Sequence, residues 1–169
     1  MCFEEAIGYL IGGFARDKDG VTTSVVTAEM AAYHYSRGKT LVDALEGLYE
    51  RFGRYEEKTV SLVMPGLDGI ERRRALMASL REARPAEIAG FAVASVTDCL
   101  DGAVYEGGER TGESPLKGSD VLRFALASGD AVVVRPSGTE PKIKIYLLTH
   151  GGDCAARLEK LVAWAKSLA

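Results

Sequence analysis

The sequence predicts an α+β fold in which a mainly antiparallel sheet is covered by helices and preceded by two further helices. Three observations carry this expectation: two helical segments occupy residues 20–52, strand segments from residue 121 to 148 follow one another through short turns, and a helix closes the chain. Strands joined by short turns pair antiparallel, and their apolar face needs covering helices. The 169 residues suffice for one domain, or for one domain plus part of another.

The first part of the chain is expected to form two helices. The first runs over about Gly20–Ser36, because Asp19 can accept from the free N–H groups of the first turn and Gly38 is a natural stop. Thr40 opens the second, LVDALEGLYERF, whose apolar residues recur at helical spacing. Their apolar faces need a sheet as partner, and residues 1–18 do not supply a full one. This segment is therefore predicted to be the tail of a larger domain.

The second part alternates strands and helices. The predicted strands are 58–64, 91–96, 121–126, 131–134 and 142–148, and the predicted helices are 68–83 and 153–168. Residues 98–117, rich in Gly and charge, are expected to be a long loop, and residues 127–130 a hairpin turn. The order is β-α-β-β-β-β-α, or close to it.

Composition and charge argue against several classes of protein. The net charge of −3 shows no basic bias, which argues against a nucleic-acid partner. No apolar run approaches the roughly 18 residues of a membrane helix, and the acidic start MCFEEAIGYL does not resemble a secretory signal. Cys2, Cys99 and Cys154 are odd in number and far apart, which predicts neither a disulfide framework nor a metal site. We expect reduced thiols and a cytoplasmic location.

The turn RPSGTEPK concentrates hydrogen-bond donors between two predicted strands. Arg135 can bind two oxygens of one anion, Ser137 and Thr139 supply hydroxyls, and Gly138 lets the backbone approach closely. Lys144 follows on the strand, on the same face as Lys142. These donors suit a phosphate ester. An ordinary hairpin turn with solvated lysines explains the same residues, so local chemistry leaves both interpretations open.

The string VVVRPSGTEPKIKIY resembles the phosphate-binding loop of the α-D-phosphohexomutases, the phosphoglucomutase and phosphomannomutase enzymes. The strings FEEAIGYLIGGFARDKDGVTTSVVTAEMAAY and GKTLVDALEGLYERFGRYEE resemble the sugar loop and following helices of the third domain in that family. The resemblance covers essentially the whole chain. It implies that residues 1–54 are the end of domain 3, an α/β domain, and that residues 55–169 are domain 4, a four-stranded, mainly antiparallel sheet covered by helices.

The family resemblance implies a four-domain enzyme that moves a phosphoryl group between positions 1 and 6 of a hexose through a phosphoserine. The family's magnesium loop, typically DGDxDR, is not found here, and no serine stands in the phosphoserine context. DKDG at residues 17–20 has too few carboxylates for that loop. We therefore expect no catalytic residue and no metal ligand in this chain, which would need the missing amino-terminal domains and Mg²⁺ for activity. The alternative is a stand-alone module that binds phosphate esters without catalysis.

The resemblance also assigns individual residues. Arg135, Ser137, Gly138 and Thr139 match the family's contacts to the substrate phosphate, and Lys144 occupies a position that is often Arg or Lys.

Two further residues are assigned in the first part of the chain. Glu4 matches the acid that accepts sugar hydroxyls, and Lys18 matches a basic residue near the transferring phosphoryl group in some members. Ala6 stands where the family usually has Ser, which leaves the sugar preference open. The other interpretation of Glu4 and Glu5 is a frayed, solvated terminus.

A few other residues receive structural interpretations. His34 and His150 lack ligand partners at metal spacing. Trp164 is expected to pack against the sheet, whereas Asp98 and the run 71–74 (ERRR) are expected to be solvated.

Overall fold

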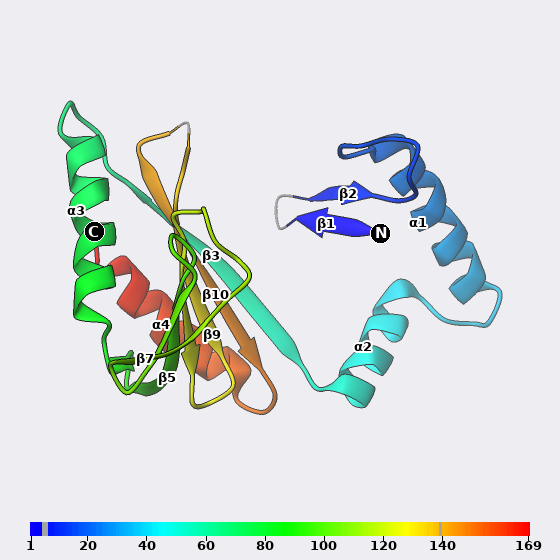
Figure 1. Ribbon diagram of the computed structural model, residues 1–169. Helices are drawn as coiled ribbons and strands as arrows, with labels where there is room; N and C mark the ends of the chain where they lie inside the picture. Colours follow the sequence, from blue (N-terminus) through cyan, green and yellow to red (C-terminus); the bar gives the residue numbers. More distant parts are fainter. Residues whose placement is uncertain (5–6, 139) are drawn as a thin grey trace. The chain divides into compact units, whose positions relative to one another are not determined.

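The computed structural model describes residues 1–4, 7–138 and 140–169, and it divides into two compact units, Met1–Phe52 and Gly53–Ala169 (Figure 1). The first unit contains β1 (Cys2–Glu4), β2 (Gly8–Leu10), α1 (Gly20–Tyr35) and α2 (Leu41–Phe52). Both predicted helices are confirmed. The strands β1 and β2 form an antiparallel ribbon that the sequence analysis did not expect.

Local capping explains where both helices begin. The Asp19 carboxylate accepts from Val21 N at 3.0 Å and from Thr22 N at 3.3 Å, as predicted. Before α2, Thr40 Oγ1 donates to Asp43 Oδ2 at 2.7 Å and accepts from Asp43 N at 3.1 Å. Each pair satisfies backbone N–H groups that have no partner within the helix.

The apolar faces of these two helices remain exposed. Neither α1 nor α2 contains a buried residue in the part of the chain that the structure describes. The large exposed apolar side chains on them include Val21, Val25, Met30, Leu45, Leu48 and Phe52. The described residues of the first unit therefore form little core of their own.

The second unit is a sheet with helices. Its elements are β3 (Tyr55–Val63), α3 (Gly69–Ala83), β4 (Glu87–Ile88), β5 (Phe91–Asp98), β6 (Ala103–Glu106), β7 (Glu109–Glu113), β8 (Leu122–Leu126), β9 (Ala131–Pro136), β10 (Lys142–His150) and α4 (Cys154–Lys166). The strand order is β3-β10-β9-β8-β5-β6-β7, β4 pairs with β5, and the described pairings are antiparallel. The predicted α+β class is confirmed.

The sheet is wider than expected. It has eight strands among the described residues, against the four that the resemblance implied. Two of the additional strands, β6 and β7, form a hairpin inside residues 98–117, which were predicted to be a loop. Gly107 and Gly108 both have positive φ, 57° and 86°, as a two-residue hairpin turn of this kind requires. The residues of β7 are all exposed, so the strand shows no apolar alternation that would have revealed it.

The helices α3 and α4 pack on one face of the sheet (Figure 1). Val134 of β9 and Ile145 of β10 are fully buried in the same cluster as Met77 of α3 and Leu161 of α4. Trp164 packs against this cluster, as predicted. None of the helices in the described part of the chain has the length and apolar character required to cross a membrane.

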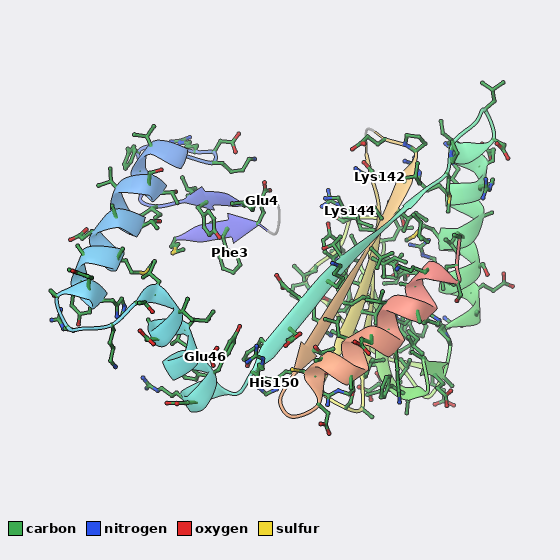
Figure 2. The ribbon with its side chains drawn as sticks, turned by 180° about the vertical axis from the view of Figure 1, so that it is seen from behind. Phe3, Glu4, Glu46, Lys142, Lys144 and His150 are labelled. Carbon is green, nitrogen blue, oxygen red and sulfur yellow. The ribbon has the colours of Figure 1, made fainter. Side chains whose placement is uncertain are left out.

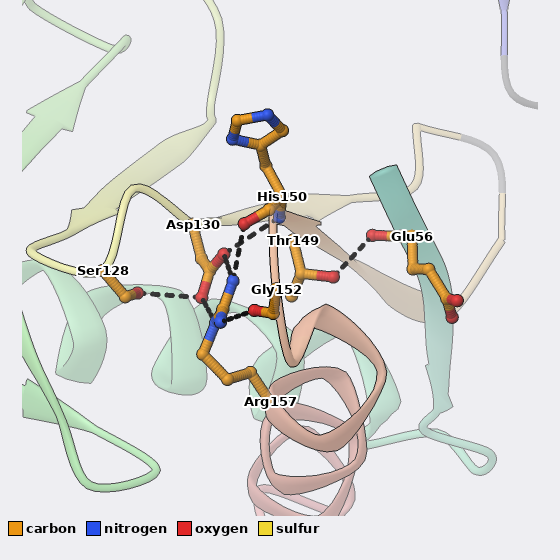
Figure 3. A network of polar contacts seen from close by, with 7 residues as sticks. All are labelled: Glu56, Ser128, Asp130, Thr149, His150, Gly152 and Arg157. Atoms are coloured by element: carbon orange, nitrogen blue, oxygen red, sulfur yellow. Dashed lines mark hydrogen bonds and ion pairs between the residues drawn. The ribbon is translucent and has the colours of Figure 1, made fainter. Parts of the chain in front are cut away.

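A buried ion pair between Asp130 and Arg157 connects the β8–β9 turn to the start of α4 (Figure 3). Arg157 Nε lies 2.6 Å from Asp130 Oδ2, and the same carboxylate accepts from Ser128 Oγ at 2.8 Å and from His150 N at 3.1 Å. Arg157 also donates to the carbonyls of Gly152 and His150, each at 2.6 Å. Burial alone raises the pKa of Asp130, but these hydrogen bonds outweigh it and hold that pKa below its usual value.

Asp98 is part of a second ion-pair network. It was expected to be solvated, but it is buried and accepts from Arg81 Nε at 2.6 Å. Arg81 Nη2 also donates to Asp120 at 2.7 Å. The helix α3 places Arg81 next to Asp98 at the end of β5. Because the two residues are 17 positions apart in the sequence, no local sequence pattern predicted this contact.

Candidate phosphate-binding turn

The strands β9 and β10 place two cationic residues side by side. Arg135 is paired with Lys144 across the antiparallel ladder, and Val134 is paired with Ile145. Directly opposed residues point to the same face of a sheet, and successive residues point to opposite faces. Arg135 and Lys144 therefore lie on the face opposite to buried Val134 and Ile145, away from the helices.

The two lysines of β10 differ in their contacts, although both lie on this face as predicted (Figure 2). Lys142 Nζ lies 2.7 Å from Glu140 Oε1, so its charge is balanced within the turn. Lys144 Nζ lies 6.0 Å from the centre of the Tyr146 ring. Of these two lysines, Lys144 is the one paired directly with Arg135 across the ladder, which places it beside Arg135.

Backbone hydrogen bonds close the turn and leave a hydroxyl proton available. Ser137 N donates to Lys142 O at 2.9 Å, and Lys142 N donates to Glu140 O at 2.8 Å. Glu140 N donates to Ser137 Oγ at 3.3 Å. Because this hydroxyl accepts within the turn, its own proton can point outward to an anion. Thr139, the other predicted hydroxyl, lies outside the described residues.

A hollow of about 380 Å³ adjoins the turn. Its lining includes Arg135, Ser137 and Gly138 from the turn together with Arg73 and Arg74 from α3. Three arginine residues thus contribute to the lining of this hollow, next to the turn.

One acidic side chain also lines the hollow, and it is paired with an arginine that it shares with Asp98. Asp120 accepts from Arg81 Nη2 at 2.7 Å. The Arg81 guanidinium therefore reduces the repulsion that Asp120 would exert on a bound anion.

Arg73 is a site residue that sequence reasoning missed. Its Nη1 donates to Ser137 O at 2.5 Å and to Glu140 O at 3.1 Å, so the expectation that residues 71–74 form a solvated face is wrong at this position. A signal was present, because Arg73 is four residues from both Gly69 and Met77, which are buried. Positions four apart share a helix face.

The first unit contains the other two predicted site residues. Lys18 Nζ lies 3.8 Å from Glu4 Oε1 and 3.0 Å from Asp17 Oδ1, and all three residues line a hollow of about 220 Å³. The hydrogen bond that Lys18 Nζ donates to the Asp17 carboxylate is the main reason why the pKa of Lys18 is raised. Glu4 lies in β1, so its backbone is paired rather than frayed.

A glycine makes this contact possible. A Cβ on Gly8 would lie 2.3 Å from Lys18 Cδ and 2.6 Å from Glu4 Oε1. Glu5 and Ala6, which bear on the predicted sugar preference, lie outside the described residues.

The acidic residues near Lys18 do not form a magnesium site. Asp17 binds Lys18, and Asp19 caps α1. Among residues 1–4, 7–138 and 140–169, no group of three or more His, Cys, Asp or Glu side chains is placed to hold a metal ion. The described residues therefore do not fit the Mg²⁺ that the resemblance implies.

Comparison with known proteins gives a consistent result. The family model described as "Phosphoglucomutase/phosphomannomutase, C-terminal domain" matches residues 74–163. A phosphoglucomutase of Staphylococcus aureus is 38% identical over 148 residues, which are 87% of this chain and 27% of the relative. A probable phosphomannomutase of Haemophilus influenzae is 38% identical over 152 residues, which are 89% of this chain and 28% of the relative.

A solved structure shares the fold. The open form of the Paramecium exocytosis-sensitive phosphoprotein pp63/parafusin, a phosphoglucomutase, matches with a TM-score of 0.57 and 16% identity. The match covers 92% of this chain and 27% of that one. The chain thus spans between a quarter and a third of the length of these relatives.

Proposed function

The chain belongs to the phosphoglucomutase/phosphomannomutase family, and from this membership we propose that its β9–β10 turn binds the phosphate group of a hexose phosphate that is not reacting. In the complete enzyme, a phosphoryl group would move between positions 1 and 6 of the hexose through a phosphoserine. We assign phosphate binding to Arg135, Ser137, Gly138, Thr139 and Lys144.

The observation that carries this proposal is the pairing of Arg135 with Lys144 at a turn in which the Ser137 hydroxyl accepts from Glu140 N. Hydrogen bonds to a charged group contribute about 1.5–3 kcal/mol each. Three or four of them would hold a phosphate ester at micromolar to millimolar concentration after the cost of immobilising the ligand. Binding energy from this remote phosphate can orient the reacting end of the sugar.

The first unit would serve the same substrate. We propose that residues 1–54 are the end of the third domain and residues 55–169 the fourth domain of the enzyme. Lys18 contacts Oε1 of Glu4, which leaves Oε2 as the proposed acceptor for sugar hydroxyls. Lys18 would approach the transferring phosphoryl group.

Chemistry is assigned to other domains. The phosphoserine and the Mg²⁺ ligands would come from parts of the enzyme that this chain does not contain, and we expect a cytoplasmic location. The 169-residue chain should therefore bind its substrate without turning it over. An assay with glucose 1-phosphate and Mg²⁺ checks this, and turnover at the rate of a complete mutase would contradict it.

One observation favours binding by the chain alone. The turn, the hollow beside it and the core that supports them all belong to the second unit, Gly53–Ala169. A stand-alone module that captures phosphate esters is therefore the second candidate function, and it shares the same binding site.

The test is titration calorimetry of the chain with glucose 6-phosphate, with glucose as the ligand control. We expect saturable binding of the phosphate ester, loss of binding in Arg135→Ala, and retention in Arg110→Ala, a change on the exposed strand β7. Absence of binding by the unaltered chain, or equal binding by Arg135→Ala, would contradict the proposed site.

A further inference from the structure

We infer that Arg73 is a positioning residue for the phosphate-binding turn, holding two backbone carbonyls so that the Gly138 amide faces the anion. This inference rests on the proposed function, because it takes the turn to be a phosphate site. Arg73 comes from α3, which is 64 residues away in the sequence from Ser137.

The contact spans the turn. A single nitrogen, Nη1 of Arg73, donates to Ser137 O at 2.5 Å and to Glu140 O at 3.1 Å. These carbonyls lie on either side of residue 139, and both bonds come from a charged donor, which makes them stronger than neutral ones. Arg73 therefore restrains the turn at two points.

The first of these bonds fixes the orientation of a donor. The Ser137 carbonyl and the Gly138 N–H belong to one planar trans peptide, so they point in opposite directions. Holding the carbonyl toward α3 turns the Gly138 N–H away from α3. This N–H has no hydrogen bond to another described residue, and it is thus available to a ligand.

The helix that carries Arg73 is itself held close to the turn. A Cβ on Gly69 would lie 1.9 Å from Met64 O and 3.6 Å from Pro141 Cβ, so only glycine permits this approach. Met64 follows β3, and its N donates to Pro141 O at 2.8 Å, which ties the segment against which Gly69 packs to the end of the turn. The part of α3 that carries Arg73 is therefore held at a fixed distance from the turn.

The neighbouring arginines provide a comparison. Arg74 Nη1 pairs with Glu71 at 3.0 Å, and both side chains are more than two-thirds exposed. Arg72 is exposed. Arg73 is half-buried. Among the described contacts of these three arginines, only the Arg73 side chain forms hydrogen bonds with the turn. Arg72→Ala is therefore a matched control.

The experiment uses the whole chain, with inorganic phosphate as the ligand. Calorimetry measures the affinity for phosphate, and the ¹H–¹⁵N resonance of Gly138 reports the conformation of the turn. We expect Arg73→Met to weaken phosphate binding about tenfold, as expected for a lost charge-assisted bond, and to shift the Gly138 resonance in the phosphate-free protein. Arg73→Lys keeps a charged donor and should retain most of the binding and the resonance position. Arg72→Ala should match the unaltered chain.

The outcomes separate this inference from the proposed function. If Arg73→Met binds phosphate normally while Arg135→Ala does not, the positioning role is overturned and the phosphate site stands. If the unaltered chain does not bind phosphate, the proposed function itself fails. Should Arg73→Met not fold, Arg73→Lys decides: lost binding with an unmoved Gly138 resonance would make Arg73 a direct ligand and overturn the inference.

Discussion

Arg135 of β9 lies directly opposite Lys144 of β10, so two cationic side chains share one face of the sheet beside the proposed phosphate site. An anion bound at this position can interact favourably with both charges. The register of β9 and β10 therefore favours binding of an anion here.

Removal of one of these charges should abolish the response to phosphate without unfolding the protein. We expect Arg135→Gln to leave the melting temperature in phosphate-free buffer nearly unchanged, because Arg135 is exposed and substitutions at exposed positions usually change stability little. The unaltered chain should gain about 2.7 kcal/mol at a phosphate concentration one hundred times its Kd. Thermal unfolding with and without phosphate measures both effects, with Arg110→Gln as the control; an equal phosphate-dependent gain in Arg135→Gln would contradict the assignment.

The Ser137 hydroxyl should contribute to both the turn and the ligand. Ser137→Ala removes the acceptor for Glu140 N and the proposed donor to phosphate, so we expect affinity to fall about tenfold or more. Ser114 is a matched control, since its hydroxyl also accepts a backbone N–H, from Leu116 at 3.1 Å. Calorimetry of Ser114→Ala should give the affinity of the unaltered chain. Equal affinities for all three proteins would remove Ser137 from the site.

The Asp130–Arg157 pair should be a main source of stability in the second unit. Asp130→Asn leaves a largely buried guanidinium without its counter-charge, so we expect a loss of about 3–5 kcal/mol in the free energy of unfolding by urea. Glu71→Gln breaks the exposed pair with Arg74 and should cost less than about 1 kcal/mol. Similar losses for both variants would refute this ranking.

The same pair predicts a pH dependence. The pKa of Asp130 is lowered in the folded protein, so its ionised form contributes stability above the unfolded pKa of about 3.9. That contribution is lost as the pH falls through the lower, folded pKa. The free energy of unfolding should therefore fall more steeply below about pH 4 in the unaltered chain than in Asp130→Asn. Parallel pH profiles would exclude Asp130 as the cause.

The close approach at Gly69 should make this position intolerant of any side chain. In Gly69→Ala the new Cβ would overlap Met64 O, so we expect a loss of about 1–3 kcal/mol and a weaker affinity for phosphate as α3 moves away from the turn. Gly152 has no heavy atom within 4 Å of an added Cβ, and Gly152→Ala should change neither quantity appreciably. Denaturant unfolding and calorimetry test both variants, and a fully stable Gly69→Ala would count against the described packing.

Patterns close in the sequence predicted much of the fold. Asp19 and Thr40 marked the starts of α1 and α2 because helix capping depends on neighbouring residues. The strands of the core were visible as short runs of apolar residues bounded by turn residues. The β6–β7 hairpin was missed, since the exposed strand β7 has no such run and only its Gly-Gly turn gave a signal.

What the sequence alone determined about this protein is the run of donors in the turn, the helix ends and the α+β class, because each depends on residues within a few positions of one another. Only the tertiary structure decided that Lys144 faces Arg135, that Lys142 is occupied by Glu140, and that Arg73 reaches the turn. Strand register and helix docking set those contacts, and both follow from how the whole core packs.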